Sequence, residues 1–362
     1  MWPVARLAAR MSRRELWTRL QLFSRCGAGL QALAPDLCAL LRQWVGADAA
    51  AVFWLDDQGM PEGFFHEDSP PAVQALFLDE FERLFVGPDE MNVLALAQRK
   101  DAALGHLVAP QASYFRSNTF NLLVRPSGHQ HCLDLRVEVQ GRPRAVVLLF
   151  RAPGRPFGTV EAACLQQVLP ALRQAIVHAP NLGASEGQIL ASGHLLVDTL
   201  GTQILWHDAA ALTLLSQANL AGTGYLKTRP LAAPPPLVAG LCSSLAAGLP
   251  VAVSQHPVPG GWLQLQARAM QAGTPGVSAA VLVTLQHWQP QPLGVAQRVA
   301  ALPLSPLQRE ITLLAGLGQP RACCGPALGV SPEALKKHLK AIYATTGCAD
   351  WGQLQQHLAA SA

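Results

Sequence analysis

The residues of this sequence best suited to bind a polyanion lie close together near the C-terminus. Three of the five lysines, Lys336, Lys337 and Lys340, fall within five residues of one another, whereas the formal net charge of the 362-residue chain is only +4. Lysine ammonium groups contact phosphate oxygens and supply affinity rather than recognition of base sequence. We therefore expect contact with nucleic acid at this segment and hardly anywhere else in the chain.

Helix start and stop residues frame the three lysines. A serine suited to cap a helix precedes a proline suited to the first helical position at Ser305-Pro306 and again at Ser331-Pro332. Gly329 stands where the helix between these two starts should end, and Gly347 closes the last one. A short helix, a tight glycine-containing turn and a second helix with exposed cations is the helix-turn-helix layout.

Helical periodicity separates a buried stripe from the lysines. In a helix over about Pro332–Ala344, Leu335, Leu339 and Ile342 recur at the spacing of one helix face. The lysines lie off that stripe and face solvent or DNA. We predict that all three contact phosphates, with one of the first two nearest the bases.

This segment resembles the LuxR-type helix-turn-helix, which is also found at the end of NarL-like response regulators. The matching positions follow the family pattern without a gap: Glu310, Gly318, Leu328-Gly329-Val330-Ser331, Leu335, His338, Ile342-Tyr343 and Gly347. The resemblance implies an all-α four-helix domain over residues 298–362, whose third helix enters the major groove of double-stranded DNA. His338 and Ser331 complete the predicted DNA-binding set.

Departures from the family pattern bear on DNA affinity. Ala334 stands where the family usually has threonine, which removes a hydroxyl suited to a phosphate, and Cys323-Cys324-Gly325 replaces the usual Glu-Ile-Ala. Pro326 falls inside the first helix of the motif, where a proline costs about 3 kcal/mol. We expect this helix to be kinked or to begin later. The alternative function is a regulator with impaired DNA binding that acts through a protein partner.

The rest of the chain is long enough for two further domains. Of all residues 50% are apolar and 14% are charged, a composition typical of packed globular cores. Pro/Gly-marked breaks at Ala179–Gly183 and Gln289–Gly294 divide the chain. We predict a multidomain protein with an α+β sensor domain and its leading helix over residues 1–180, a second α+β domain over 185–290, and the helix-turn-helix domain.

The first domain combines helices with antiparallel strands. A helical pattern that ends at Gly46 is followed by a buried strand over Ala49–Leu55. Two strands, Leu133–Val139 and Ala145–Arg151, then precede one long helix over Gly158–Val177. The domain resembles a GAF domain over most of residues 25–178, and four short motifs carry the likeness: Gly46–Ala49, Asp56–Gly59, Gly141–Pro143 and Arg155–Phe157.

The second domain resembles a PAS domain. Strands over His194–Asp198 and Thr199–Trp206 surround a tight turn, and a helix follows over Asp208–Ser216; Trp262–Ala269 and Val277–Gln286 pair as strands. In the family an Asn-containing turn commonly joins the opening hairpin to an Ala/Leu-rich helix, and here His207-Asp208 takes that place.

Aromatic residues crowd the first domain, and we predict that some of them line an apolar effector pocket in which a few polar groups fix orientation. The predicted effector is an apolar or aromatic small molecule. The predicted effector-binding residues are Trp54, Phe65, Tyr114, Phe115, Asn118, Phe120, Asn121, Arg125 and His131. The alternative is that these aromatic side chains are ordinary core.

Other chemistries lack their residue patterns. The sequence contains no Gly-x-x-x-x-Gly-Lys-Ser/Thr and no His-Glu-x-x-His. His129 and His131 would share a strand face and could bind a metal or haem, but no further ligands are spaced to complete such a site. We therefore predict no cofactor, no metal and no catalysis, with a small-molecule enzyme as the third alternative.

The eight cysteines are scattered without a C-x-x-C pair, and no apolar run reaches the ~18–20 residues that span a bilayer. We predict a cytoplasmic, one-component transcriptional regulator without a membrane partner. An effector would shift a homodimer between two arrangements and so change the spacing of its recognition helices. The leading helix near Trp17–Leu33 and the helix Gly158–Val177 are the predicted dimer contacts.

Overall fold

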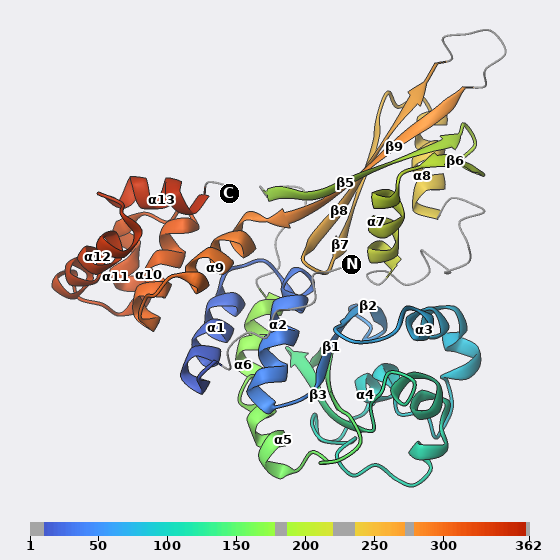
Figure 1. Ribbon diagram of the computed structural model, residues 1–362, viewed down its shortest axis with the longest axis horizontal. Helices are drawn as coiled ribbons and strands as arrows, with labels where there is room; N and C mark the ends of the chain where they lie inside the picture. Colours follow the sequence, from blue (N-terminus) through green and yellow to red (C-terminus); the bar gives the residue numbers. More distant parts are fainter. Residues whose placement is uncertain (1–10, 178–186, 220–235, 272–278, 360–362) are drawn as a thin grey trace.

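The computed structural model describes residues 11–177, 187–219, 236–271 and 279–359. Within these ranges the chain is a mixed α/β structure with thirteen α-helices and two antiparallel sheets (Figure 1). The predicted domain break at Ala179–Gly183 lies outside the described residues. None of the described helices combines the length and hydrophobicity that crossing a bilayer requires.

The first sheet has the strand order β2-β1-β4-β3. Its strands are β1 (Ala49–Leu55), β2 (Pro61–His66), β3 (His131–Val139) and β4 (Arg142–Arg151). One face packs against α1 (Arg13–Arg25), α2 (Leu30–Val45), α5 (Thr159–Gln166) and α6 (Leu169–Val177). The other face packs against α3 (Pro71–Leu84), α4 (Val93–Gln98), the 3₁₀ turn η1 (Tyr114–Arg116) and the π-helical turn η2 (Thr119–Val124).

Strand β1 shows how the two faces differ. All seven of its residues are buried, so the predicted buried strand is confirmed. Because successive side chains of a strand point to opposite faces, Val52 and Trp54 join the core with α1 and α2, whereas Phe53 and Leu55 join the core on the other side. Gly46 ends α2 with φ 75°, as the sequence predicts.

The second sheet has the order β6-β5-β9-β8-β7. Its strands are β5 (Gly187–Asp198), β6 (Ile204–His207), β7 (Ala252–Val258), β8 (Gly261–Met270) and β9 (Ala280–Pro290), and it carries α7 (Ala209–Asn219) and α8 (Pro236–Ala246) on one face (Figure 1). The predicted hairpin and the helix after it are present, although the second strand begins at Ile204 and not at Thr199. Asp208 caps α7, since its Oδ1 accepts from the N–H of Ala211 at 2.7 Å.

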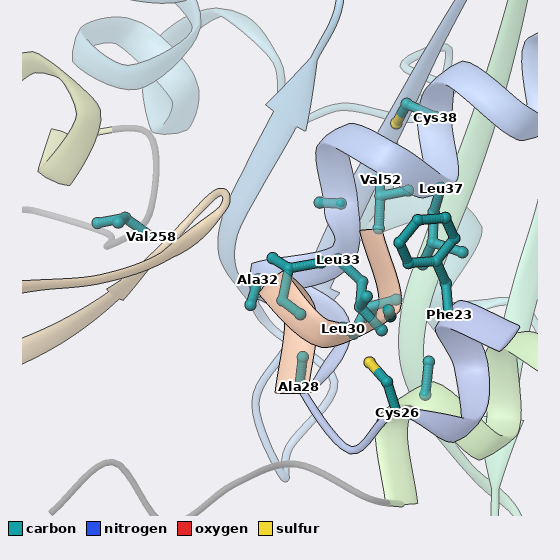
Figure 2. Packing of buried hydrophobic residues seen from close by; sticks show 14 of the residues in the cluster. Phe23, Cys26, Ala28, Leu30, Ala32, Leu33, Leu37, Cys38, Val52 and Val258 are labelled. Atoms are coloured by element: carbon teal, nitrogen blue, oxygen red, sulfur yellow. The ribbon is translucent and has the colours of Figure 1, made fainter. Parts of the chain in front are cut away.

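The turn between β7 and β8 packs against the start of α2. The N–H of Gly260 donates to the carbonyl of Ala32 at 3.1 Å. Val258 belongs to the same buried cluster as Ala32, Leu33 and Phe23 (Figure 2). The second sheet and the first domain therefore share one continuous apolar core.

Five helices follow β9: α9 (Gln291–Ala301), α10 (Pro306–Gly316), α11 (Arg321–Leu328), α12 (Pro332–Thr346) and α13 (Trp351–Ala359). At the predicted break Gln289–Gly294, β9 continues to Pro290 and α9 begins at Gln291, so strand and helix follow each other directly. Pro290 and Pro292 do not interrupt the helix. The N–H groups at the start of a helix have no acceptor within the helix, so a residue that lacks one is tolerated there.

Helix α1 joins the first domain to the C-terminal helices, since it contacts α2, α6, α9 and α10 (Figure 1). Arg309 of α10 has a side chain only 7% exposed and places its Nη1 2.8 and 2.9 Å from the two carboxylate oxygens of Glu15. Arg19 donates to the same carboxylate at 2.8 Å. Burial opposes ionisation, but the hydrogen bonds and charges of Arg19 and Arg309 hold the pKa of Glu15 below its usual value. We call this contact the Glu15–Arg309 junction.

Two segments that were each predicted to form one helix form two helices in the structure. The leading helix near Trp17–Leu33 is α1 and α2, because Gly27 and Gly29 adopt φ values of 83° and 82° between them. The predicted helix Gly158–Val177 is α5 and α6, and Pro170 stands four residues after the last residue of α5, where it cannot continue the helical hydrogen bonds.

The predicted dimer contact through the leading helix needs a related correction. Leu16, Leu20 and Phe23 of α1 are buried inside the chain itself. In this arrangement the apolar side of α1 therefore faces its own chain and is not free for a second copy.

We expect Glu15→Gln to lower the free energy of unfolding by about 2 kcal/mol, because it leaves the Arg309 guanidinium without its counter-charge. The loss is smaller than for a dry ion pair because the Glu15 side chain keeps 29% of its surface exposed. Urea unfolding measures it. The matched control is Arg83→Gln, which removes an ion pair whose arginine is 70% exposed and should cost less than about 0.5 kcal/mol. Equal effects of the two substitutions would contradict a structural role for the junction.

Candidate nucleic-acid interface and ligand cavity

Helices α11 and α12 form the predicted pair joined by a tight turn. Gly329 ends α11 with φ 64°, in the left-handed region that favours glycine. Ser331 caps α12, since its Oγ accepts from the N–H of Ala334 at 3.3 Å, and Gly347 closes α12 with φ 72°. Ser305 caps α10 in the same way. These four start and stop predictions are confirmed.

The three lysines of α12 lie on its exposed side. Leu335, Leu339 and Ile342 are buried, as predicted. The lysines are exposed, and none of them forms an ion pair with any described residue. His338 is partly buried, and the Ser331 hydroxyl is used by its own helix cap. Helix α12 thus presents three positive charges, free of internal partners in the described part of the chain, on one face.

Arg321 adds a cation that the sequence pattern does not single out. It is the first residue of α11 and is exposed. Burial raises the pKa of Tyr343 on α12, and the positive charge of Arg321 opposes this change, so the two side chains lie near each other. An isolated arginine gives no periodic signal, and its proximity to α12 follows from the fold.

Pro326 does not delay the helix that contains it. Helix α11 runs from Arg321 to Leu328, so of the two alternatives the later start is wrong and the kink stays a prediction. The proline lacks the N–H that would bond the carbonyl of Ala322. Helix α11 is only about two turns long, and the missing hydrogen bond is one that would join its first turn to its last turn.

An apolar cavity lies in the first domain, on the face of the sheet opposite α1 and α2. The space between its walls is about 640 Å³ when the open solvent at its mouth is counted. Phe53, Phe64, Leu148 and Phe150 form the sheet wall, and α3, α4 and η2 supply the opposite wall. Among the described residues that line the cavity, none is a lysine, arginine, aspartate or glutamate.

Two histidines bring polar atoms into this apolar wall. The rings of His66 and His129 stack on Phe150, with centroids 4.8 and 5.1 Å away. The N–H of Asp68 donates to Nδ1 of His66 at 3.1 Å. Burial lowers the pKa of His66 to about 3, and His129 beside it adds to the shift. Burial also lowers the pKa of His129, so both rings are uncharged near neutral pH.

His129 is 4% exposed, and neither of its ring nitrogens has a hydrogen-bond partner among the described residues. In the described part of the chain, no three side chains of His, Cys, Asp and Glu gather to hold a metal ion. The pairing of His129 with His131 on one strand face is wrong, because β3 begins at His131 and His129 precedes it.

Of the predicted effector-binding residues, Tyr114 lines this cavity and the other eight do not. Trp54 and Phe65 contact the core on the opposite face of the sheet, because Phe53 and Phe64 occupy the cavity side of their strands. His131 does not line the cavity either, whereas its neighbour Cys132 does.

The remaining five lie beside the cavity or away from it. The side-chain amides of Asn118 and Asn121 bond nearby backbone carbonyls, those of Leu84 and of Phe115 and Ser117. Phe115 is 43% exposed and Arg125 is also exposed. Phe120 is buried in the same core without lining the cavity.

The predicted effector-binding set does not contain the cavity residues Phe53, Phe64, His66, His129 and Cys132. For Phe53 and Phe64 the sequence carries a pattern that points to two different faces of the strand. Each belongs to an adjacent aromatic pair in a strand, Phe53-Trp54 and Phe64-Phe65, and adjacent strand residues cannot share a face. Nothing in the local pattern indicates which member of each pair faces the cavity.

No protein-family model matches the sequence, and no curated protein matches it. Solved structures with some likeness include the Vibrio cholerae VqmA–ligand–DNA complex, at 13% identity and a TM-score of 0.24, covering 47% of this chain and 82% of that one. The phage VqmA–DPO complex has 14% identity and a TM-score of 0.21, covering 46% and 81%. The sensor region of a sensor histidine kinase has 16% identity and a TM-score of 0.19, covering 71% and 90%. TM-scores this low carry no argument about fold or function.

The lowered pKa of His66 predicts a pH dependence of stability. An unfolded histidine takes up its proton near pH 6.5, whereas folded His66 does so at about 3. Stability is therefore fully present above about pH 6.5 and falls as the pH is lowered toward 3, with a loss of about 2 kcal/mol from this group at about pH 5. We expect His66→Phe, which keeps the stacking ring, to flatten the change in unfolding free energy between about pH 7.5 and 5. An identical pH dependence in both proteins would contradict an uncharged His66 in the cavity wall.

Proposed function

We propose that this protein is a ligand-responsive transcriptional regulator that binds double-stranded DNA. The observation that carries the proposal is the exposed face of α12, where Lys336, Lys337 and Lys340 have no ion-pair partner among the described residues. Helix α12 follows α11 through a capped glycine turn, the layout of helix-turn-helix proteins. The C-terminal unit is proposed to be LuxR-type, and the sensor units GAF-like and PAS-like.

The lysines of α12 and the polar residues near them have different proposed roles in DNA binding. Lysines bind phosphates as point charges and set the register of the helix on the duplex. Arg321 at the start of α11 extends the positive surface. His338 is half-buried and is placed for packing or for one phosphate contact. Since Ser331 already caps α12, we assign it to orientation of the helix.

A chain of contacts links the ligand cavity to the DNA-binding helices. The sheet carries the cavity on one face and α2 on the other; α2 packs on α1, and α1 meets α10 at the Glu15–Arg309 junction. We propose that a ligand shifts the population between two arrangements of this chain of elements. In a homodimer such a shift would change the spacing of the two α12 helices. The protein is proposed to act in the cytoplasm and without catalysis.

The test is a gel shift with duplex DNA from upstream of the protein's own gene, measured across a salt series. We expect wild-type binding to weaken steeply with salt, because each neutralised phosphate contributes about 0.9 to the slope of log K against log salt. The triple substitution of Lys336, Lys337 and Lys340 by glutamine should abolish binding or lower that slope by about three. Glutamine preserves helix propensity, so α12 should stay folded.

Lys100→Gln is the matched control, since Lys100 is exposed in the first domain and distant in sequence from α12. It should leave affinity and salt slope unchanged. Unchanged binding by a folded triple variant would overturn the proposed interface. If folded wild-type protein binds no DNA and instead captures a protein partner through residues 298–362, the alternative function replaces the proposal. Catalytic turnover that survives deletion of this region would point to an enzyme.

A further inference from the structure

His129 stands out among the polar side chains of the first domain. It lines the apolar cavity, it is 4% exposed, and neither Nδ1 nor Nε2 has a hydrogen-bond partner among the described residues. Buried polar groups in folded proteins are nearly always paired, because an unmade hydrogen bond leaves the cost of desolvation uncompensated. A ligand in the cavity would supply the missing partner.

The cavity selects against charged ligands. Among the described residues that line it there is no lysine, arginine, aspartate or glutamate, and burial keeps both histidines neutral. An anionic ligand would enter without a counter-charge, and a cationic ligand likewise, so each would lose its hydration without compensation.

The shape of the wall favours a flat ring. Phe53 and Phe64 stack with centroids 5.2 Å apart, and Phe77 meets Phe64 edge-on at 5.6 Å. His66, His129 and Phe150 form a second group of rings, in which both histidines stack on Phe150 and their own centroids are 6.1 Å apart. Ring walls of this kind hold an aromatic guest by offset stacking and edge contacts.

The hydrogen-bonding group of the ligand follows from the neutral imidazole. A neutral histidine ring has one nitrogen that donates and one that accepts. A hydroxyl group both donates and accepts, so it satisfies whichever nitrogen faces it.

We propose that the cavity binds a small, uncharged aromatic alcohol whose hydroxyl group hydrogen-bonds to His129. This assignment rests on the proposed function in one respect, that the bound molecule is the effector of the regulator.

The test is isothermal titration of the full-length protein with three probes that share one ring. 4-Methylphenol is neutral near pH 7 and carries the hydroxyl, toluene lacks it, and 4-methylbenzoate carries a negative charge instead. We expect one 4-methylphenol to bind per chain, about tenfold more tightly than toluene, because toluene leaves His129 unpaired. 4-Methylbenzoate should bind more weakly than both, and EDTA should change nothing.

His129→Phe keeps a ring in the wall and removes both nitrogens. It should lower the affinity for 4-methylphenol to that for toluene and leave toluene binding unchanged. The matched control is His131→Phe, two residues away, whose side chain does not line the cavity; it should keep the tenfold preference. Unfolding curves of both variants verify that they are folded.

Several outcomes would overturn the inference: equal binding of 4-methylphenol and toluene, preferred binding of 4-methylbenzoate, loss of the preference in His131→Phe, no binding of any probe, or binding that EDTA removes. The proposed function is judged separately by the lysine-dependent gel shift. If that gel shift succeeds while no probe binds, the regulator stands and the ligand class is wrong. If the probes bind as expected while no DNA does, the cavity assignment stands and the regulator is wrong.

Discussion

The ionic contact between Glu15 and Arg309 connects two parts of the chain that are almost three hundred residues apart in sequence. Arg309 is nearly completely buried, and a guanidinium in that position is stable only while a carboxylate stays beside it. The contact therefore fixes α10 against α1, and α1 is packed on the helices that cover the first sheet. Any movement in the first domain that displaces α1 must either carry α10 with it or break this pair. The position of the lysine face of α12 depends on the same contact, because α12 packs on α10.

The period of two along the strands places the cavity and the helical layer on opposite faces of the same strands. Adjacent residues such as Phe53 and Trp54 lie on opposite faces of one strand, one against the cavity and one against the helices. A ligand that changes the packing on the first face acts on a strand whose other face holds α2. His129 gives the cavity a chemical preference as well as a shape, because its nitrogens have no partner among the described residues.

Local chemistry made the C-terminal elements predictable, and long-range packing limited the rest. Ser305, Ser331, Gly329 and Gly347 end or begin helices through contacts within a few residues, so their roles are readable from sequence. The strand of Ala49–Leu55 is equally evident from its unbroken apolar run. The cavity was not predictable in this way: the choice between Phe64 and Phe65 depends on strand register, and His129 reaches the site from a loop. The segment Gln289–Gly294 carries two prolines that suggest a linker, yet they sit at a helix start, where they are tolerated.

The proposal that α12 binds specific DNA sequences can be tested by selection from a random double-stranded library. Full-length protein is incubated with the library, bound duplexes are recovered and sequenced, and a folded triple glutamine variant of Lys336, Lys337 and Lys340 is treated in parallel. We expect enrichment of a defined sequence motif with the wild-type protein and no enrichment with the variant. The same composition as the input library after repeated rounds with folded wild-type protein, or equal enrichment with the variant, would contradict it.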